Sequence, residues 1–160
     1  MSTITAVLLC VGFVVVLVII VFLTRELTHR SKTIKCDDGP RRTIDIRDFT
    51  TRYSAYTVEL ETSVKDQAKA SAKFSPIQLQ QMSESLQSAN EFRKYVVAGY
   101  NACAISKAQY GEYEARFRTL DALSRQINVF VSKPALDESE RHELDSLVKQ
   151  YVDVSSKLAA

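Results

Sequence analysis

Twenty consecutive residues near the N-terminus, positions 4–23, carry no charged side chain. A helix rises 1.5 Å per residue, so a run of this length spans about 30 Å, the thickness of the hydrocarbon core of a bilayer. The run is longer than the apolar part of a signal peptide, and no basic residue precedes it. The sequence therefore predicts a transmembrane anchor over residues 1–24, with the rest of the chain on one side of the membrane.

Basic residues follow the predicted anchor and suggest its orientation. Residues 25–42 contain six Lys or Arg against three acids, and we expect this segment to be a basic juxtamembrane linker. Positive charge gathers on the cytoplasmic side of membrane proteins, which predicts an integral single-pass protein with its N-terminus outside and its C-terminal domain in the cytoplasm. The residues expected at the membrane interface, in contact with lipid, are Arg25, Arg30, Lys32 and Lys35.

The three cysteines are odd in number and far apart in the sequence. Three widely spaced cysteines do not suggest a set of disulfides, which agrees with the predicted cytoplasmic location. Cys103 lies on an apolar stripe, so we expect it to be buried as a small apolar residue. Cys36 lies close to the predicted anchor, and acylation of its thiol is a hypothesis.

Residues 43–160 form one predicted helical domain. Apolar residues recur every three or four positions, and Ser75 before Pro76 and Asp137 before Glu140 are typical helix starts. We expect helices over residues 44–73 and 137–158, and between them two apolar stripes, over residues 75–103 and 110–131, that belong to one long helix or to two. The predicted fold class is all-α: a single transmembrane helix followed by a three- or four-helix antiparallel bundle, or a coiled-coil-like cytoplasmic domain.

The middle of this domain allows two interpretations. The apolar stripe changes phase between residues 106 and 112, and Gly111 lies in that window. A break at Gly111 would give four helices of similar length. Without a break, one helix of about 56 residues would be about 84 Å long. Local helix propensity is high on both sides of Gly111, and for that reason we favour the continuous helix.

The search for chemistry finds no catalytic constellation. The two histidines, His29 and His142, lack partners at metal-binding spacing, and there is no Gly-rich phosphate loop or Gly-x-Ser-x-Gly motif. The helical domain is nearly neutral, which disfavours a nucleic-acid role. We therefore expect a protein that is not an enzyme and that takes no cofactor, metal, nucleic acid or small-molecule substrate.

The segment from 95 to 103 is the most distinctive part of the helical domain. Gly99 and Cys103 lie one turn apart and would let another helix approach closely, while Asn101 could form a hydrogen bond across such a contact. The candidate helix–helix contact residues are Gly99, Tyr100, Asn101 and Cys103. The alternative is ordinary packing inside the bundle.

These observations favour a single-pass, membrane-anchored interaction or scaffold protein that tethers partners or self-assembles through its helices. The alternative is a membrane-active effector whose anchor oligomerises and perturbs the bilayer under control of the helical domain. Gly12 is the main small residue in the anchor, which gives little support for tight association within the membrane. The sequence does not identify the partner.

Overall fold

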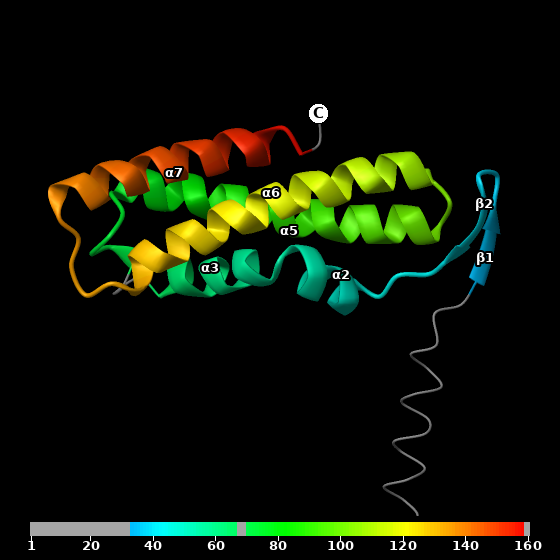
Figure 1. The fold of residues 1–160 in the computed structure, drawn as a ribbon, viewed down its shortest axis with the longest axis horizontal. Helices are drawn as coiled ribbons and strands as arrows, with labels where there is room; N and C mark the ends of the chain where they lie inside the picture. The colour runs from blue at the N-terminus through cyan, green and yellow to red at the C-terminus, as the bar shows by residue number, and fades with distance from the viewer. Residues whose placement is uncertain (1–32, 67–69, 159–160) are drawn as a thin grey trace, which may run out of the picture. The chain divides into compact units, whose positions relative to one another are not determined.

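Helices dominate residues 33–66 and 70–158, the part of the chain that the computed structural model describes. A short hairpin precedes them (Figure 1). The elements in chain order are β1 (Thr33–Cys36), β2 (Gly39–Arg42), α2 (Ile46–Tyr53), α3 (Ala55–Lys65), α5 (Pro76–Asn101), α6 (Lys107–Ser132) and α7 (Glu138–Ser156).

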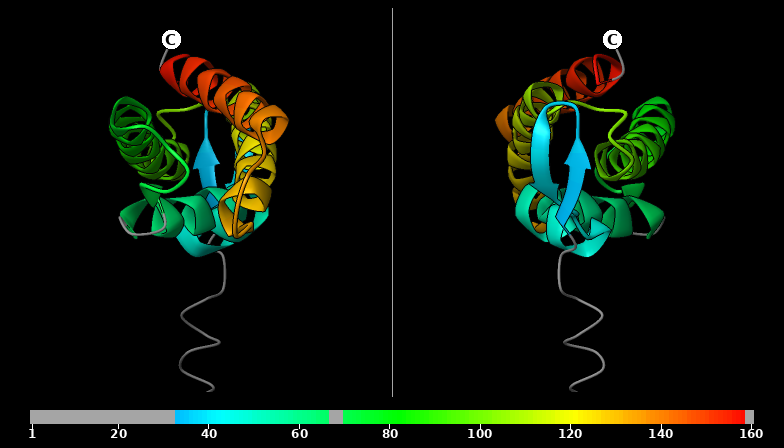
Figure 2. Two further views of the ribbon diagram at one scale, coloured as in Figure 1. Left: turned by 90° about the vertical axis from the view of Figure 1, so that its left-hand side faces the viewer. Right: turned by 90° about the vertical axis from the view of Figure 1, so that its right-hand side faces the viewer.

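The helices form an up-and-down bundle. α2, α3 and α6 run in one direction, and α5 and α7 run in the other (Figure 1). α6 packs extensively against α3 and α7, α5 packs against α7, and the contact between α3 and α5 is smaller. Viewed from its ends, the bundle has α5 and α6 on opposite sides, α7 between them on one face and α2 and α3 on the other (Figure 2).

The two ends of the bundle are built differently because α7 is shorter than its neighbours. α7 has 19 residues, whereas α5 and α6 have 26 each. Beyond the end of α7, aromatic rings join α5 directly to α6. The centroid of Phe92 lies 5.1 Å from that of Tyr113, and the rings of Tyr100 and Tyr110 lie 4.3 Å apart. At one end the core is therefore surrounded by four helices, α3, α5, α6 and α7. At the other end it is surrounded by α2, α5 and α6.

The core at this second end is centred on Phe49 of α2, which is only 1% exposed. Its ring makes edge-on contacts with Tyr53, Tyr110 and Phe117, with centroid distances of 5.0, 6.0 and 5.2 Å. Such pairs contribute about 0.5–1.5 kcal/mol each beyond the burial of apolar area. These contacts hold the short helix α2 against α6.

Two of the expected helix starts are present. Ser75 and Asp137 both form capping boxes, with Gln78 and Glu140 respectively. The first predicted helix, residues 44–73, is instead divided at Ser54 into α2 and α3, and α3 ends at Lys65. Both changes shorten the helix that was expected from the apolar stripe alone.

The favoured continuous helix through Gly111 is wrong. α5 ends at Asn101 and α6 begins at Lys107, so the break lies before the phase change rather than at Gly111. Ser106 caps α6 through a capping box with Gln109. Cys103 has a φ of 60°, in the left-handed region that ends helices.

The all-α fold class is also wrong, because the predicted linker contains an antiparallel hairpin. Cys36 pairs with Gly39 across the two-residue turn Asp37–Asp38, and Thr33 pairs with Arg42. Gly39 has a φ of +100°, which a glycine adopts at little cost. The sequence predicted only a basic linker here, and the two strands were not expected.

The prediction of an integral single-pass membrane protein is corrected as well. The expected anchor, residues 1–24, lies outside the described residues. Among the helices that the structure does describe, none is both long enough and apolar enough to cross a bilayer. The two longest, α5 and α6, carry polar residues on their outer faces, as bundle helices do. The structure therefore gives no support to the predicted membrane location.

The chain folds back over Gly99 where α5 ends. The carbonyl oxygen of Gly99 accepts hydrogen bonds from the backbone N–H groups of Ala104 and Ile105, at 2.8 and 3.2 Å. A Cβ at Gly99 would lie 2.7 Å from Cδ1 of Ile105, which is a buried side chain. At Gly111 a Cβ would meet no described atom within 4 Å.

These two glycines give a matched pair of alanine substitutions. We expect Gly99→Ala to lower the free energy of unfolding by about 1–3 kcal/mol, because the new methyl group overpacks the turn. We expect Gly111→Ala to raise it by about 0.5–1 kcal/mol, because alanine favours an exposed helix position. Urea denaturation of both variants measures the two effects, and equal effects of the same sign would contradict this description of the turn.

Candidate interaction sites

The side chain of Arg41 joins the hairpin to the helices and is only 5% exposed. Its Nη1 donates hydrogen bonds to the carbonyl oxygens of Tyr100 and Ile105, at 3.1 and 2.6 Å. Its Nη2 donates to Oδ1 of Asp38 at 2.6 Å, and the guanidinium lies 4.4 Å from the centroid of the Tyr100 ring. We call these contacts, together with those of Asp38 and Asn101 below, the hairpin clamp.

The chemistry of a helix end explains this position of Arg41. The last carbonyl groups of a helix have no partner within the helix and carry partial negative charge, so a cation is favourable there. Arg41 supplies one donor to Tyr100 in the last turn of α5 and another to Ile105 in the turn that follows. A planar guanidinium can satisfy several acceptors and stack on an aromatic ring at the same time, which the ammonium group of lysine cannot do.

Asp38 extends the clamp to the next helix. Its Oδ2 accepts a hydrogen bond of 2.7 Å from the backbone N–H of Lys107, the first residue of α6. This hydrogen bond and the neighbouring Arg41 guanidinium hold the pKa of Asp38 below its ordinary value. The carboxylate therefore contacts the positive end of α6 and the cation that caps α5.

Two further links reinforce this end of the bundle. The side-chain amide of Asn101 pairs with the backbone of Ile44, donating to its carbonyl oxygen and accepting from its N–H, both at 2.8 Å.

Cys36 and Cys103 form a disulfide with a Cα–Cα distance of 5.5 Å. The expectations that the cysteines do not pair and that Cys103 is buried are therefore wrong. Cys36 likewise has no free thiol to acylate.

The four candidate helix–helix contact residues lie together at this end of the bundle. Gly99 packs under the turn that follows α5, and Tyr100, Asn101 and Cys103 contact the hairpin or the segment just after it. Their contacts are made within one chain. Of the predicted membrane-interface residues, Lys35 lies exposed in β1, whereas Arg25, Arg30 and Lys32 lie outside the described residues.

A groove lies between α3 and α5, two helices whose contact with each other is small. It contains two cavities, of about 210 and about 540 Å³, which share Val64, Lys65 and Ser83. We call this the α3–α5 groove. Its other lining residues are Glu61 and Ser71 from the α3 side, and Leu79, Gln80, Leu86, Gln87 and Asn90 from α5.

A buried cation stands behind the wall of this groove. Arg93 is 8% exposed and donates a hydrogen bond of 2.5 Å to Oδ1 of Asn90. Its Nε has no hydrogen-bond partner among the described residues. Burial lowers the pKa of Arg93, and the negative charge of Glu61 opposes that shift. Most of the residues that line the groove are polar. Val64 and Leu86, which are buried, give it an apolar floor.

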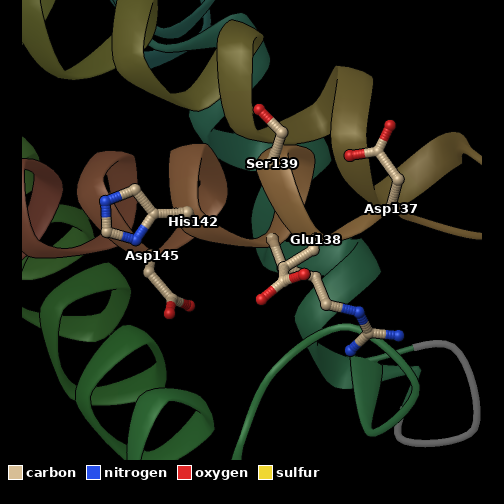
Figure 3. A pocket seen from close by; sticks show the side chains of 6 residues that line it. Asp137, Glu138, Ser139, His142 and Asp145 are labelled. Atoms are coloured by element: carbon tan, nitrogen blue, oxygen red, sulfur yellow. The ribbon is translucent and has the colours of Figure 1, made fainter.

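A third hollow lies at the start of α7, lined by Asp137, Glu138, Ser139, Arg141, His142 and Asp145. Figure 3 shows that its labelled side chains spread in different directions instead of converging on one point. Within the described ranges, no three His, Cys, Asp or Glu side chains are placed so that they could hold one metal ion. The expectations that the chain is not an enzyme and takes no cofactor or nucleic acid stay predictions.

Sequence reasoning missed both the clamp and the groove. Arg41 had been assigned only to a basic linker, and its role depends on a hairpin that was not expected. The groove residues on α5 recur at helical spacing, but their partner helix α3 is set by tertiary packing.

No protein-family model matches the chain, and neither the curated proteins nor the solved structures give a match. Function must therefore be argued from the geometry.

The clamp gives a prediction for the two adjacent arginines of β2. We expect Arg41→Ala to lower the free energy of unfolding by about 3 kcal/mol, because two carbonyl groups and Asp38 lose a buried charged donor. Arg42→Ala, at an exposed position in the same strand, should change it by less than about 0.5 kcal/mol. Urea denaturation compares them, and a small effect at Arg41 would exclude the clamp as a stabilising contact.

Asp38 gives a prediction for the pH dependence of stability. Its pKa is lower in the folded chain than in the unfolded chain, where it is about 3.9. The carboxylate therefore favours the folded state above about pH 4, and this contribution disappears as the pH falls further. We expect the stability difference between wild type and Asp38→Asn to shrink between pH 6 and pH 3. Asp37→Asn, in the same turn, is the control. A difference that does not vary with pH would contradict this role.

Proposed function

We propose that residues 33–158 form a helical interaction module that binds a helix of another protein in the α3–α5 groove. The observation that carries the proposal is the open seam between α3 and α5, which holds two adjoining cavities. The other long contacts in the described bundle, between α6 and α3, α6 and α7, and α5 and α7, are more extensive. A partner helix could therefore enter this seam without displacing one of the bundle's own helices.

The dimensions of the groove fit a short helix. On α5 the lining residues run from Leu79 to Asn90, about 16 Å or three helical turns. An amphipathic helix binds such a groove with apolar side chains at positions i, i+3 or i+4, and i+7. Small aliphatic side chains would contact Val64 and Leu86, while Ser83 and Gln87 offer hydrogen bonds at the edge.

Charge indicates the composition of the partner. α5 contains no Lys or Arg from Pro76 to Phe92, whereas Glu84 and Glu91 lie exposed on this stretch. Gln80 and Gln87 donate hydrogen bonds to these two carboxylates, each at 3.0 Å, which orders a polar ridge beside the groove. We infer a partner helix with an apolar stripe and Lys or Arg on the side that faces α5. Complementary charge of this kind sets orientation and the rate of association.

The partner can be identified by photo-cross-linking in the native cell. A photoreactive phenylalanine analogue replaces Gln87 in the full chain, and the same analogue at Ser88 is the control, because Ser88 is exposed but lines neither cavity. The proposal expects a discrete adduct from position 87, with the cross-linked peptide helical and basic on one side. Equal adducts from both positions, or an adduct only to a second copy of this chain, would overturn it.

Filling the groove should weaken binding of the partner so identified. We expect Ser83→Trp to raise the Kd at least about tenfold, equivalent to about 1.4 kcal/mol, because the indole occupies the space shared by the two cavities. Ser88→Trp, on the same helix, should leave the Kd within about twofold. Titration calorimetry measures both, and circular dichroism checks that both variants are folded. Equal Kd values for the two variants would count against the groove.

A further inference from the structure

We infer that this domain folds and works in an oxidising compartment, where the Cys36–Cys103 disulfide permanently fastens the hairpin to the turn between α5 and α6. The bond joins residues 67 positions apart in the sequence. Disulfides of this kind persist in oxidising environments and are rare where glutathione and thioredoxin keep thiols reduced. This inference does not depend on the proposed partner groove.

The clamp fastens both cysteine-bearing segments through contacts other than the disulfide. Asp38 and Arg41 fix the hairpin two and five residues after Cys36, and Asn101 is anchored two residues before Cys103. The Cα–Cα distance of 5.5 Å lies in the ordinary range for disulfides. The disulfide therefore joins two segments that hydrogen bonds also hold close together.

The backbone conformation at Cys103 is a second, separate reason to infer a lasting disulfide. Its φ of 60° places it in the left-handed region, and it is the one residue other than glycine that has a positive φ among the described residues. Glycine, or less often asparagine, is the usual residue where a helix ends in this way. A cysteine here disfavours the local backbone, so its presence is explained by what its side chain does.

Exposure argues against a packing role for either sulfur. Cys103 is exposed and Cys36 is half-buried, whereas a structural free cysteine is normally buried as a small apolar residue. As free thiols, the pair would lie side by side and be open to solvent. Such a pair is readily oxidised, and only a reducing environment would keep it in the thiol form.

Formation of the bond follows ordinary thiol–disulfide exchange. The thiolate of one cysteine attacks the disulfide of an oxidant protein, one oxidant sulfur leaves as a thiolate, and a mixed disulfide forms. The second cysteine then attacks, completes Cys36–Cys103 and releases the oxidant as a dithiol. The two cysteines lose two protons and two electrons, and the oxidant protein gains them.

Thiol trapping in intact cells tests the inference directly. Free thiols of the full chain are blocked with one maleimide, the protein is denatured and reduced, and newly released thiols take a second maleimide of different mass. We expect the peptides that contain Cys36 and Cys103 to carry the second label. A non-reducing digest should give these peptides linked and two hydrogens lighter. The first label on both cysteines would overturn the inference.

Thermal unfolding of the full chain tests whether the bond matters to the fold. We expect a reducing agent to lower the Tm of wild type by about 10 °C or more, because a long loop in the unfolded chain is no longer closed. The double variant Cys36→Ser and Cys103→Ser should match reduced wild type and be insensitive to the reducing agent. Cys10 is the one cysteine left in this variant, so any response of its Tm to the reducing agent would come from Cys10. A wild-type Tm that does not respond to reduction would contradict the structural role of the bond.

Discussion

A buried guanidinium must find acceptors for its hydrogen bonds, and this requirement at Arg41 organises one whole end of the molecule. The side chain contacts the carbonyl group of Tyr100 at the end of α5 and that of Ile105 in the turn that follows, as well as the ring of Tyr100 and the carboxylate of Asp38. Asp38 in turn contacts the first N–H group of α6. The hairpin is therefore joined by two side chains of opposite charge to the end of α5 and the start of α6, about 60 residues later in the sequence. The hairpin is part of the domain because of this network.

The short length of α7 divides the bundle into two regions with different roles. Where α7 is absent, aromatic rings such as Phe49 and Phe92 fill the core, and the hairpin clamp closes the end. Where α7 is present, four helices surround the axis and the α3–α5 groove remains partly open. The surface that we propose for partner binding therefore lies toward the end that contains α7, away from the hairpin clamp.

The sequence was a good guide to local signals and a poor guide to contacts between distant segments. The capping residues Ser75 and Asp137 marked two helix starts correctly, because a cap depends only on its immediate neighbours. The change of apolar phase near Gly111 was noticed, but the capping box at Ser106 was overlooked, and the favoured continuous helix was wrong. The disulfide could not be inferred from spacing, since it depends on a hairpin and a turn that meet only in the folded chain. The groove depends in the same way on where α3 ends.

Hydrogen exchange of the intact native chain tests most directly whether the clamp makes the hairpin part of the folded domain. The measurement compares backbone amides in residues 33–42 with those in α6, residues 107–132, under identical conditions. If the clamp operates as described, hydrogen-bonded amides of the hairpin are protected and lose their protection only in openings that also reach the turn after α5. Exchange of the hairpin at the rate of an unfolded peptide, while α6 stays protected, would contradict the account.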